Sequence, residues 1–209
     1  KSVEHLCQDV GVGSNNNVDI LINNGGVSSR SRFVETSIDV DAKLVQVNYL
    51  AGAALAKAVV PKMMENGSGK IIWISSVQGK LGIPNRTSYA ASKFAVQGYC
   101  ESLRAELASS GITVHIVSPG YINTNLSQSA ITGNGEAYGQ TDATTAQGAD
   151  PDQLAATILN RVANKEMDFV IAAGLSATLA VWARFFCPTL LQWVLVKRYE
   201  SSQTKEKSD

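Results

Sequence analysis

Lys70-Ile-Ile-Trp-Ile-Ser-Ser76 is an apolar run, too short for a helix and rich in β-branched residues, and it predicts a buried strand. Comparable runs lie before and after it, at residues 18–22, 112–117 and 168–172. Segments with apolar residues at helical spacing separate these runs, at residues 39–64, 87–108 and 151–164. Strands that alternate with helices of this length favour right-handed βαβ crossovers and a parallel sheet covered on both faces. The predicted fold class is α/β.

The composition fits one packed domain without a net charge. Of the 209 residues, 44% are hydrophobic, and the 18 Lys and Arg balance the 18 Asp and Glu. This apolar content is enough for one sizeable core and argues against disorder over most of the chain. Because there is no basic excess, we do not expect a nucleic-acid partner.

The cysteines predict neither a disulfide framework nor a metal site. Cys7, Cys100 and Cys187 are odd in number and far apart, and the chain has only 2 histidines to join them. We expect three buried or inert thiols in a reducing compartment.

A phenol and an ammonium are placed for chemistry on the helix predicted at 87–108. Tyr89 and Lys93 stand at i and i+4, so they share one face of the helix. A lysine cation beside a phenol favours the phenolate and lowers the pKa of the tyrosine, which then serves as a general acid or base. Alone the pair is a weak motif, because two such residues on an exposed helix face are usually solvated.

Other polar residues strengthen the motif. Ligands of parallel sheets bind beyond the carboxyl ends of the strands, and Asn23–Gly26, Ser76 and Pro119–Thr124 follow strands here. The Ser76 hydroxyl is placed to hold a carbonyl oxygen beside the Tyr89 phenol. Asn48, on the preceding helix, either faces solvent or joins the site, and its apolar neighbours favour the second position.

These residues resemble the short-chain dehydrogenase/reductases (SDRs). Asn23-Asn-Gly-Gly26 is similar to the family's Asn-Asn-Ala-Gly loop, and Pro119-Gly120 with Thr124 is similar to its Pro-Gly turn and following Thr. Four residues match its catalytic tetrad in order and spacing: Asn48, Ser76, Tyr89 and Lys93. The match covers roughly residues 18–172. Three stretches resemble the SDR family member 7 group, closest to its 7B-like members: Ile83–Lys93, Ser118–Leu126 and Thr144–Gly148.

The resemblance implies hydride transfer between a nicotinamide cofactor and a carbonyl or alcohol. The cofactor would be NADP or NAD, with a weak preference for NADP, and no metal is implied. Tyr89 would exchange the proton, and Lys93 would lower the pKa of that tyrosine and bind the nicotinamide ribose. Ser76 would bind the substrate carbonyl, and Asn48 would position a water that relays protons to Lys93.

The resemblance also assigns secondary positions. Residues that would contact the cofactor are Thr124, Asn24 and Gly25, the last two allowing close backbone approach and pinning the sheet. The sequence itself places three further residues away from the carboxyl ends of the strands, so we expect them to be structural: Ser92, His115 and Tyr199.

The family's Gly-rich phosphate-binding turn has no counterpart in this sequence. Gly11-Val-Gly13 follows a helical-looking stretch and precedes an Asn run, so it predicts a loop that binds no phosphate. The chain opens with Lys1, and its first methionine is Met63. The resemblance therefore implies that residues 1–174 are the C-terminal two-thirds of one Rossmann-type domain, a doubly wound sheet lacking its first strands. Residues 18–22 would then form an interior strand with one edge bare.

Residues 175–209 predict a separate hydrophobic segment with a polar end. Arg184 is the only charged residue between Leu175 and Val196, and aromatic residues surround it. Because Arg184 and Pro188 oppose a membrane span, we favour an interfacial or hairpin segment. A helix pair lining a substrate pocket or dimer contact, and a span, stay open as alternatives. The resemblance implies association with the endoplasmic reticulum or peroxisomal membrane.

Two classes of function follow. The first is a reductase or dehydrogenase of a lipid-like substrate; the resemblance implies acyl- or alkyl-dihydroxyacetone phosphate, while other group members act on steroids, retinoids or quinones. The second is a non-catalytic chain that keeps the site residues but cannot hold cofactor, or a membrane-associated binding protein. The resemblance also implies a homo-oligomer paired through the helices at 39–64 and 87–108.

Overall fold

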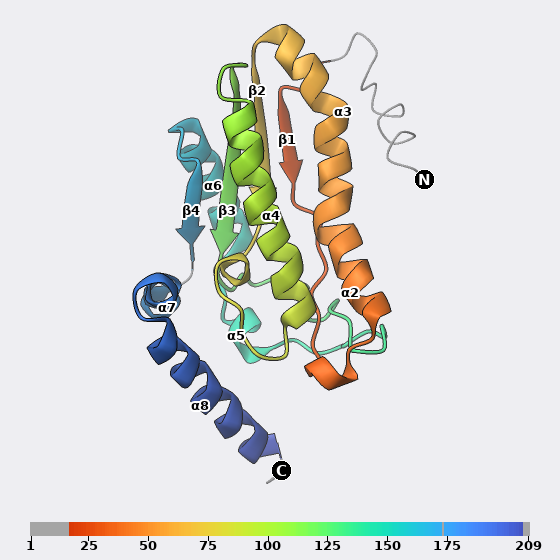
Figure 1. Ribbon diagram of the computed structural model, residues 1–209, viewed down its shortest axis with the longest axis vertical. Coiled ribbons are helices and arrows are strands. Elements are labelled where there is room, and N and C mark those ends of the chain that lie inside the picture. The colour runs from red at the N-terminus through yellow and green to blue at the C-terminus, as the bar shows by residue number, and fades with distance from the viewer. Residues whose placement is uncertain (1–16, 173, 207–209) are drawn as a thin grey trace.

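A parallel four-stranded sheet forms the centre of the computed structural model, which describes residues 17–172 and 174–206 (Figure 1). The strands lie in the order β1-β2-β3-β4, and Trp73 of β2 pairs in register with Asn23 of β1 and Ile116 of β3. Their bounds are β1 Ile20–Asn23, β2 Gly69–Ile74, β3 Ile112–Pro119 and β4 Asp168–Ile171. The predicted α/β class is confirmed, with each strand within two residues of its expected limits.

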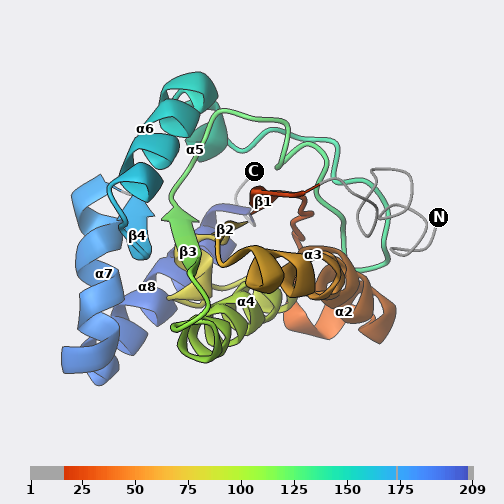
Figure 2. The ribbon, with the colours of Figure 1, turned by 90° about the horizontal axis from the view of Figure 1, so that it is seen from above.

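Helices cover both faces of this sheet, as Figure 2 shows from above: α3 and α4 lie on one face and α6 on the other. The α-helices are α2 Ile38–Val45, α3 Ala51–Asn66, α4 Thr87–Glu106, α5 Ala143–Ala146, α6 Pro151–Ala163, α7 Gly174–Phe186 and α8 Pro188–Glu206. Three shorter or wider helical turns are η1 Phe33–Glu35, η2 Gln46–Leu50 and η3 Val77–Gly79.

Local sequence accounts for the helix ends. Asp150 caps α6 by accepting a 2.9 Å hydrogen bond from the backbone N–H of Gln153, and Pro151 fits the first turn, as predicted. Gly67 ends α3 with a φ of 63°, a left-handed conformation that glycine adopts without strain.

Alternating side chains of the strands build two core layers. Ile71, Trp73 and Ile116 are 0–1% exposed and pack under α3 and α4. Ile72 and Val117 face the other way and pack against α6. β1 is an edge strand of the described sheet, and Ile20 and Ile22 are each 49% exposed, so the bare edge predicted for residues 18–22 is confirmed. Cys7 and Gly11–Gly13 lie outside the described residues.

The single helix predicted at residues 39–64 is interrupted. One wide π-helical turn, η2, separates α2 from α3, and Asn48 lies inside this turn. Such turns insert an extra residue into the helix and occur often at functional sites. The whole stretch Ile38–Asn66 is the one helix among the described residues that is long and apolar enough to cross a membrane, but α3 buries Val59 and Met63 in the core.

The tail forms two helices: α7 lies just below the end of β4 in Figure 1, and α8 descends from it to the bottom of the picture. α7 is fastened by Arg184, which donates a 2.9 Å hydrogen bond to the carbonyl of Lys80 and lies 4.5 Å from the Phe94 ring centroid. The break falls at Cys187, which is exposed. Of the thiols predicted to be buried or inert, Cys100 is buried, and the inertness of Cys187 stays a prediction.

Candidate active site

The polar residues of interest gather at the carboxyl ends of the strands. In Figure 1 the arrows of all four strands point toward the same lower edge, where α5 and the connecting loops lie. Parallel strands place their carboxyl ends together, so residues distant in sequence meet there.

Ser76 lies just beyond β2 and is 8% exposed. Its hydroxyl oxygen accepts a 3.1 Å hydrogen bond from the backbone N–H of Gln78. The Ser76 hydroxyl also forms a hydrogen bond that lowers the pKa of Tyr89. The structure thus brings the predicted carbonyl-binding serine against the predicted proton donor.

Asn48 is buried at 4% exposure, so the solvent-facing alternative is wrong. Its Oδ1 accepts from the backbone N–H of Val27 at 2.8 Å, and its Nδ2 donates to the Val27 carbonyl at 2.9 Å. The same Nδ2 donates to the Ser92 hydroxyl at 2.9 Å. The π-helical turn aims this amide at the loop after β1, while Asn48 as the holder of a relay water stays a prediction.

Ser92, expected to be structural, connects two members of the site. It is fully buried, and its hydroxyl donates a 2.8 Å hydrogen bond to the Tyr89 carbonyl while accepting from Asn48. Its place three residues after Tyr89 on the same helix face was the available signal. His115, by contrast, is buried between the Thr113 hydroxyl and the Glu166 carbonyl, which confirms its structural role.

Tyr89 and Lys93 share one face of α4, as predicted. The Lys93 ammonium lies 5.8 Å from the Tyr89 ring centroid. The net pKa of Tyr89 is raised, because burial of the phenol outweighs the Ser76 hydrogen bond and the positive charges of Arg30 and Arg86 that lower it. A lowering of this pKa by Lys93 stays a prediction.

Lys93 itself is an unusual buried cation. It is 4% exposed, and burial lowers its pKa from 10.5 to about 8. Its hydrogen bond to the Ile74 carbonyl, at 2.9 Å, uses one of its three donors. The remaining donors suit hydroxyl acceptors such as those of a ribose.

Gly26 provides the space for such a ligand. A β-carbon at this position would lie 3.3 Å from Asn48 Oδ1 and 3.5 Å from Lys93 Nζ, so the bare backbone approaches both groups. This cradle, together with the Lys93 donors, fits a nicotinamide ribose held by Tyr89 and Lys93. Nothing lies within 4 Å of a β-carbon at Gly25, the glycine predicted to contact the cofactor, so the close backbone approach occurs at Gly26 of the same loop motif.

The other predicted cofactor residues lie at the same edge. Asn24, Gly25 and Thr124 are exposed, and the Thr124 hydroxyl accepts a 3.4 Å hydrogen bond from the backbone N–H of Leu126. Their contact with a cofactor stays a prediction. The buried member of the asparagine pair is Asn23 and not Asn24: Asn23 is 8% exposed and donates a 3.4 Å hydrogen bond to the Gly52 carbonyl of α3.

A buried polar network supports these groups from behind. The Gln97 amide nitrogen donates to the hydroxyls of Ser75 at 3.0 Å and Ser118 at 3.1 Å, joining α4 to the ends of β2 and β3. Over the described ranges, no group of three His, Cys, Asp or Glu side chains is placed to hold a metal ion.

Comparison with known proteins identifies the family. The family model described as short chain dehydrogenase matches residues 1–135. The chain belongs to this family. It is 50% identical over 192 residues to a Drosophila melanogaster protein named dehydrogenase/reductase SDR family protein 7-like, with 92% of this chain and 59% of that protein covered. It is 46% identical over 189 residues to dehydrogenase/reductase SDR family member 7B of Danio rerio, with 90% and 61% covered. The chain thus spans about three-fifths of each relative's length.

Solved structures of the family share this fold. A short-chain dehydrogenase from Streptomyces avermitilis aligns with a TM-score of 0.72 at 27% identity, covering 99% of this chain and 77% of that one. A gluconate 5-dehydrogenase from Burkholderia cenocepacia in complex with NADP and tartrate gives 0.68 at 26% identity, with 81% and 69% covered. A 4-hydroxyisoleucine dehydrogenase complexed with NADH gives 0.67 at 26% identity, with 84% and 76% covered. The Rossmann-type fold expected from the family motifs is confirmed.

Proposed function

We propose that this chain supplies the catalytic residues of an NAD(P)(H)-dependent oxidoreductase that interconverts a carbonyl and an alcohol. The observation that carries the proposal is the meeting of Tyr89, Ser76, Lys93 and Asn48 at one edge of the sheet. Membership of the short-chain dehydrogenase family and relatives solved with NADP or NADH support it. NADP(H) is the preferred cofactor in this proposal.

The residues divide the work of carbonyl reduction. A bound nicotinamide would supply hydride to the carbonyl carbon. The Tyr89 hydroxyl gives its proton to the carbonyl oxygen, and the Ser76 hydroxyl donates a hydrogen bond to the same oxygen. Lys93 binds the ribose hydroxyls and stabilises the phenolate that remains. Asn48 fixes the loop that carries Gly26 and, through Ser92, the backbone of Tyr89.

The proposed substrate is lipid-like, with acyl- or alkyl-dihydroxyacetone phosphate as the specific candidate. Its support is the likeness to the member 7 group and an apolar tail close to the site. Gln203, near the end of α8, lines the same cavity as Arg30 and Arg86, the two cations that act on Tyr89. The alternative of a helix pair that lines a substrate pocket is therefore supported for the end of α8.

Oxidation of NADPH by the full-length protein tests the function. With acyl-dihydroxyacetone phosphate as substrate, Tyr89→Phe should reduce kcat by about 10²- to 10⁴-fold, because the general acid is lost. Tyr99→Phe, on the same helix but away from Ser76, is the matched control and should turn over normally. Equal turnover by wild type and Tyr89→Phe would overturn the assignment.

We also propose that α7 and α8 contact a membrane surface, at the endoplasmic reticulum or peroxisome. Trp182, Phe186 and Trp193 are 58%, 76% and 59% exposed, and amphipathic aromatic rings favour the headgroup region. Flotation of the full-length protein with phosphatidylcholine–phosphatidylserine vesicles should weaken in Trp182→Ser/Phe186→Ser. Phe33→Ser, at an exposed phenylalanine on η1, is the control. Equal flotation of all three proteins would refute this contact.

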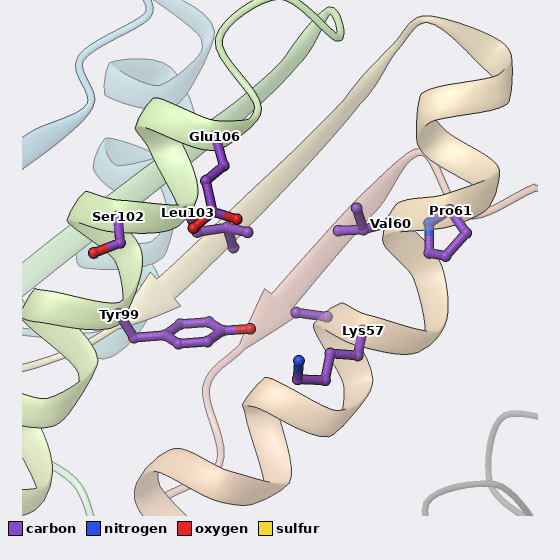
Figure 3. A pocket seen from close by; sticks show the side chains of 8 residues that line it. Lys57, Val60, Pro61, Tyr99, Ser102, Leu103 and Glu106 are labelled. Atoms are coloured by element: carbon purple, nitrogen blue, oxygen red, sulfur yellow. The ribbon is translucent and has the colours of Figure 1, made fainter.

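A homodimer through α3 and α4 is the proposed assembly. Figure 3 shows the groove between these helices, with Lys57 on the α3 wall and Glu106 on the α4 wall. Its volume is about 340 Å³. Light scattering should report a dimer for the full-length protein and a monomer for Leu103→Glu; a monomeric wild type would overturn this assembly.

A further inference from the structure

Two arginines converge on a single carboxylate oxygen beside the proposed active site. Arg30 donates to Asp142 Oδ2 through Nε at 2.9 Å and Nη2 at 2.6 Å, and Arg86 donates to the same oxygen at 3.4 Å. The three side chains are only 10%, 14% and 17% exposed, in the order Arg30, Arg86, Asp142. Among the side chains that the structure describes at this point, one negative charge thus faces two positive charges, which leaves one positive charge in excess.

Arg86 is the less satisfied of the two. Its hydrogen bonds to Asp142 and to the Ser29 carbonyl are both 3.4 Å long, beyond the roughly 2.7–3.2 Å of a good N–H···O bond. Burial and the charge of Arg30 lower the pKa of Arg86 to about 10. A stronger anionic acceptor would shorten these bonds and balance the excess charge.

The pair borders a cavity of about 590 Å³. Asn85, Tyr138 and Gln203 complete much of its wall. Glu35 supplies another carboxylate on this wall. It accepts a 2.9 Å hydrogen bond from Arg32, so its charge is paired with Arg32 and does not balance the charge of Arg86.

The cavity is coupled to the reacting groups. Arg86 immediately precedes α4 and stands three residues before Tyr89. Burial raises the pKa of Tyr89, and the charges of Arg30 and Arg86 both act against that rise. Arg30 lies three residues after Val27, whose backbone is hydrogen-bonded to the Asn48 side chain. A group bound between the arginines therefore lies within electrostatic reach of the Tyr89 phenol.

We propose that Arg30 and Arg86 bind an anionic oxygen group of the substrate, a phosphate or a carboxylate, while Tyr89 and Ser76 hold its carbonyl. The inference rests on the proposed oxidoreductase function and adds the residues that determine its specificity. A purely structural clamp between Asp142 and the loop after β1 is complete with Arg30 alone. Burying the Arg86 guanidinium there adds a desolvation penalty, unless a ligand accepts hydrogen bonds from its N–H groups.

Binding can be measured without turnover. Titration calorimetry of the full-length protein, without cofactor, compares glycerol, glycerate and glycerol 3-phosphate. We expect one or both anions to bind and glycerol not to, with the stronger anion identifying phosphate or carboxylate. Arg86→Gln should weaken that binding about tenfold or more. Arg161→Gln, at an exposed pair with Glu166, is the control and should bind as wild type.

Arg86→Lys is a second variant that tests the proposal if Arg86→Gln fails to fold. It keeps the charge without the planar guanidinium, so it should bind the anion severalfold more weakly than wild type. Equal binding of glycerol and both anions, or wild-type affinity in a folded Arg86 variant, would overturn the proposal.

Turnover separates this inference from the proposed function. With a wild type that reduces both acyl-dihydroxyacetone and its phosphate, Arg86→Gln should raise KM about tenfold for the phosphate alone. An equal rise for both substrates would contradict anion binding by Arg86. A wild type that reduces neither would refute the proposed function, and the calorimetric result would still decide the anion site.

Discussion

Replacing Lys93 with methionine should stabilise the folded protein. Methionine keeps the apolar stem and removes an ammonium that is 4% exposed. Burial lowers the pKa of Lys93 from 10.5 to about 8, which corresponds to about 3 kcal/mol of cost to the folded state when both states are protonated. The substitution also leaves the Ile74 carbonyl without its 2.9 Å hydrogen bond, at about 1 kcal/mol. The net gain at pH 7 should be about 2 kcal/mol.

The pH dependence isolates the lysine. Between pH 8 and 10.5 the unfolded chain keeps the Lys93 proton while the folded chain has released it, so wild-type stability rises with pH in this window. Lys93→Met has no such proton. Its advantage over wild type should shrink by about 2 to 3 kcal/mol from pH 7 to pH 10.

Urea unfolding of the full-length protein without cofactor, followed by tryptophan fluorescence, measures this difference. Lys62→Met is the matched control, because Lys62 is 44% exposed and pairs with Glu65 at the surface. Its stability should stay within about 0.5 kcal/mol of wild type at every pH. A Lys93→Met protein that is less stable than wild type at pH 7, or whose advantage does not change with pH, would refute the reasoning.

Three further predictions concern other sites. Asn48→Ala breaks three hydrogen bonds of a buried amide, so thermal unfolding should show a loss of about 2–4 kcal/mol; an unchanged Tm would contradict this geometry. Asp150→Ala removes the cap of α6 and should cost about 1 kcal/mol with turnover unchanged, measured by urea unfolding and NADPH oxidation. Iodoacetamide should alkylate Cys187 in the folded protein and Cys100 only after unfolding, because Cys100 is buried and its pKa is raised to about 12. Peptide mapping measures this order, and alkylation of Cys100 before Cys187 would contradict the prediction.

The sequence predicted the sheet better than the geometry of the site. Short β-branched runs such as Ile112–Val117 have few alternatives to a strand, and their predicted limits lie within two residues of the observed ones. The orientation of two adjacent identical residues was harder to predict. Which asparagine of Asn23-Asn24 is buried depends on where β1 ends, and the strand extends one residue further than its apolar run.

Features that arise from packing carried no local signal. The π-helical turn at Gln46–Leu50 has ordinary helical composition, and the contact that uses it is Asn48 with the distant Val27. The direction of the Tyr89 pKa is also set by burial under segments far away in sequence. The order and spacing of the predicted catalytic residues can thus be read from the sequence, whereas their pKa values depend on the tertiary structure.

The buried cations connect stability with the proposed function. Lys93 and the Arg30–Arg86 pair each place positive charge where it is poorly solvated, and only a large apolar core offsets that cost. Trp73, 1% exposed between β1 and β3, contributes to that core, because each fully buried large side chain is worth about 1.5–3 kcal/mol. The desolvation penalty of these cations should fall when an anion or ribose hydroxyls accept hydrogen bonds from them in place of water. The groups that lower the stability of the free protein are therefore the ones proposed to bind its ligands. Ligand binding at these buried charges should raise the free energy of unfolding.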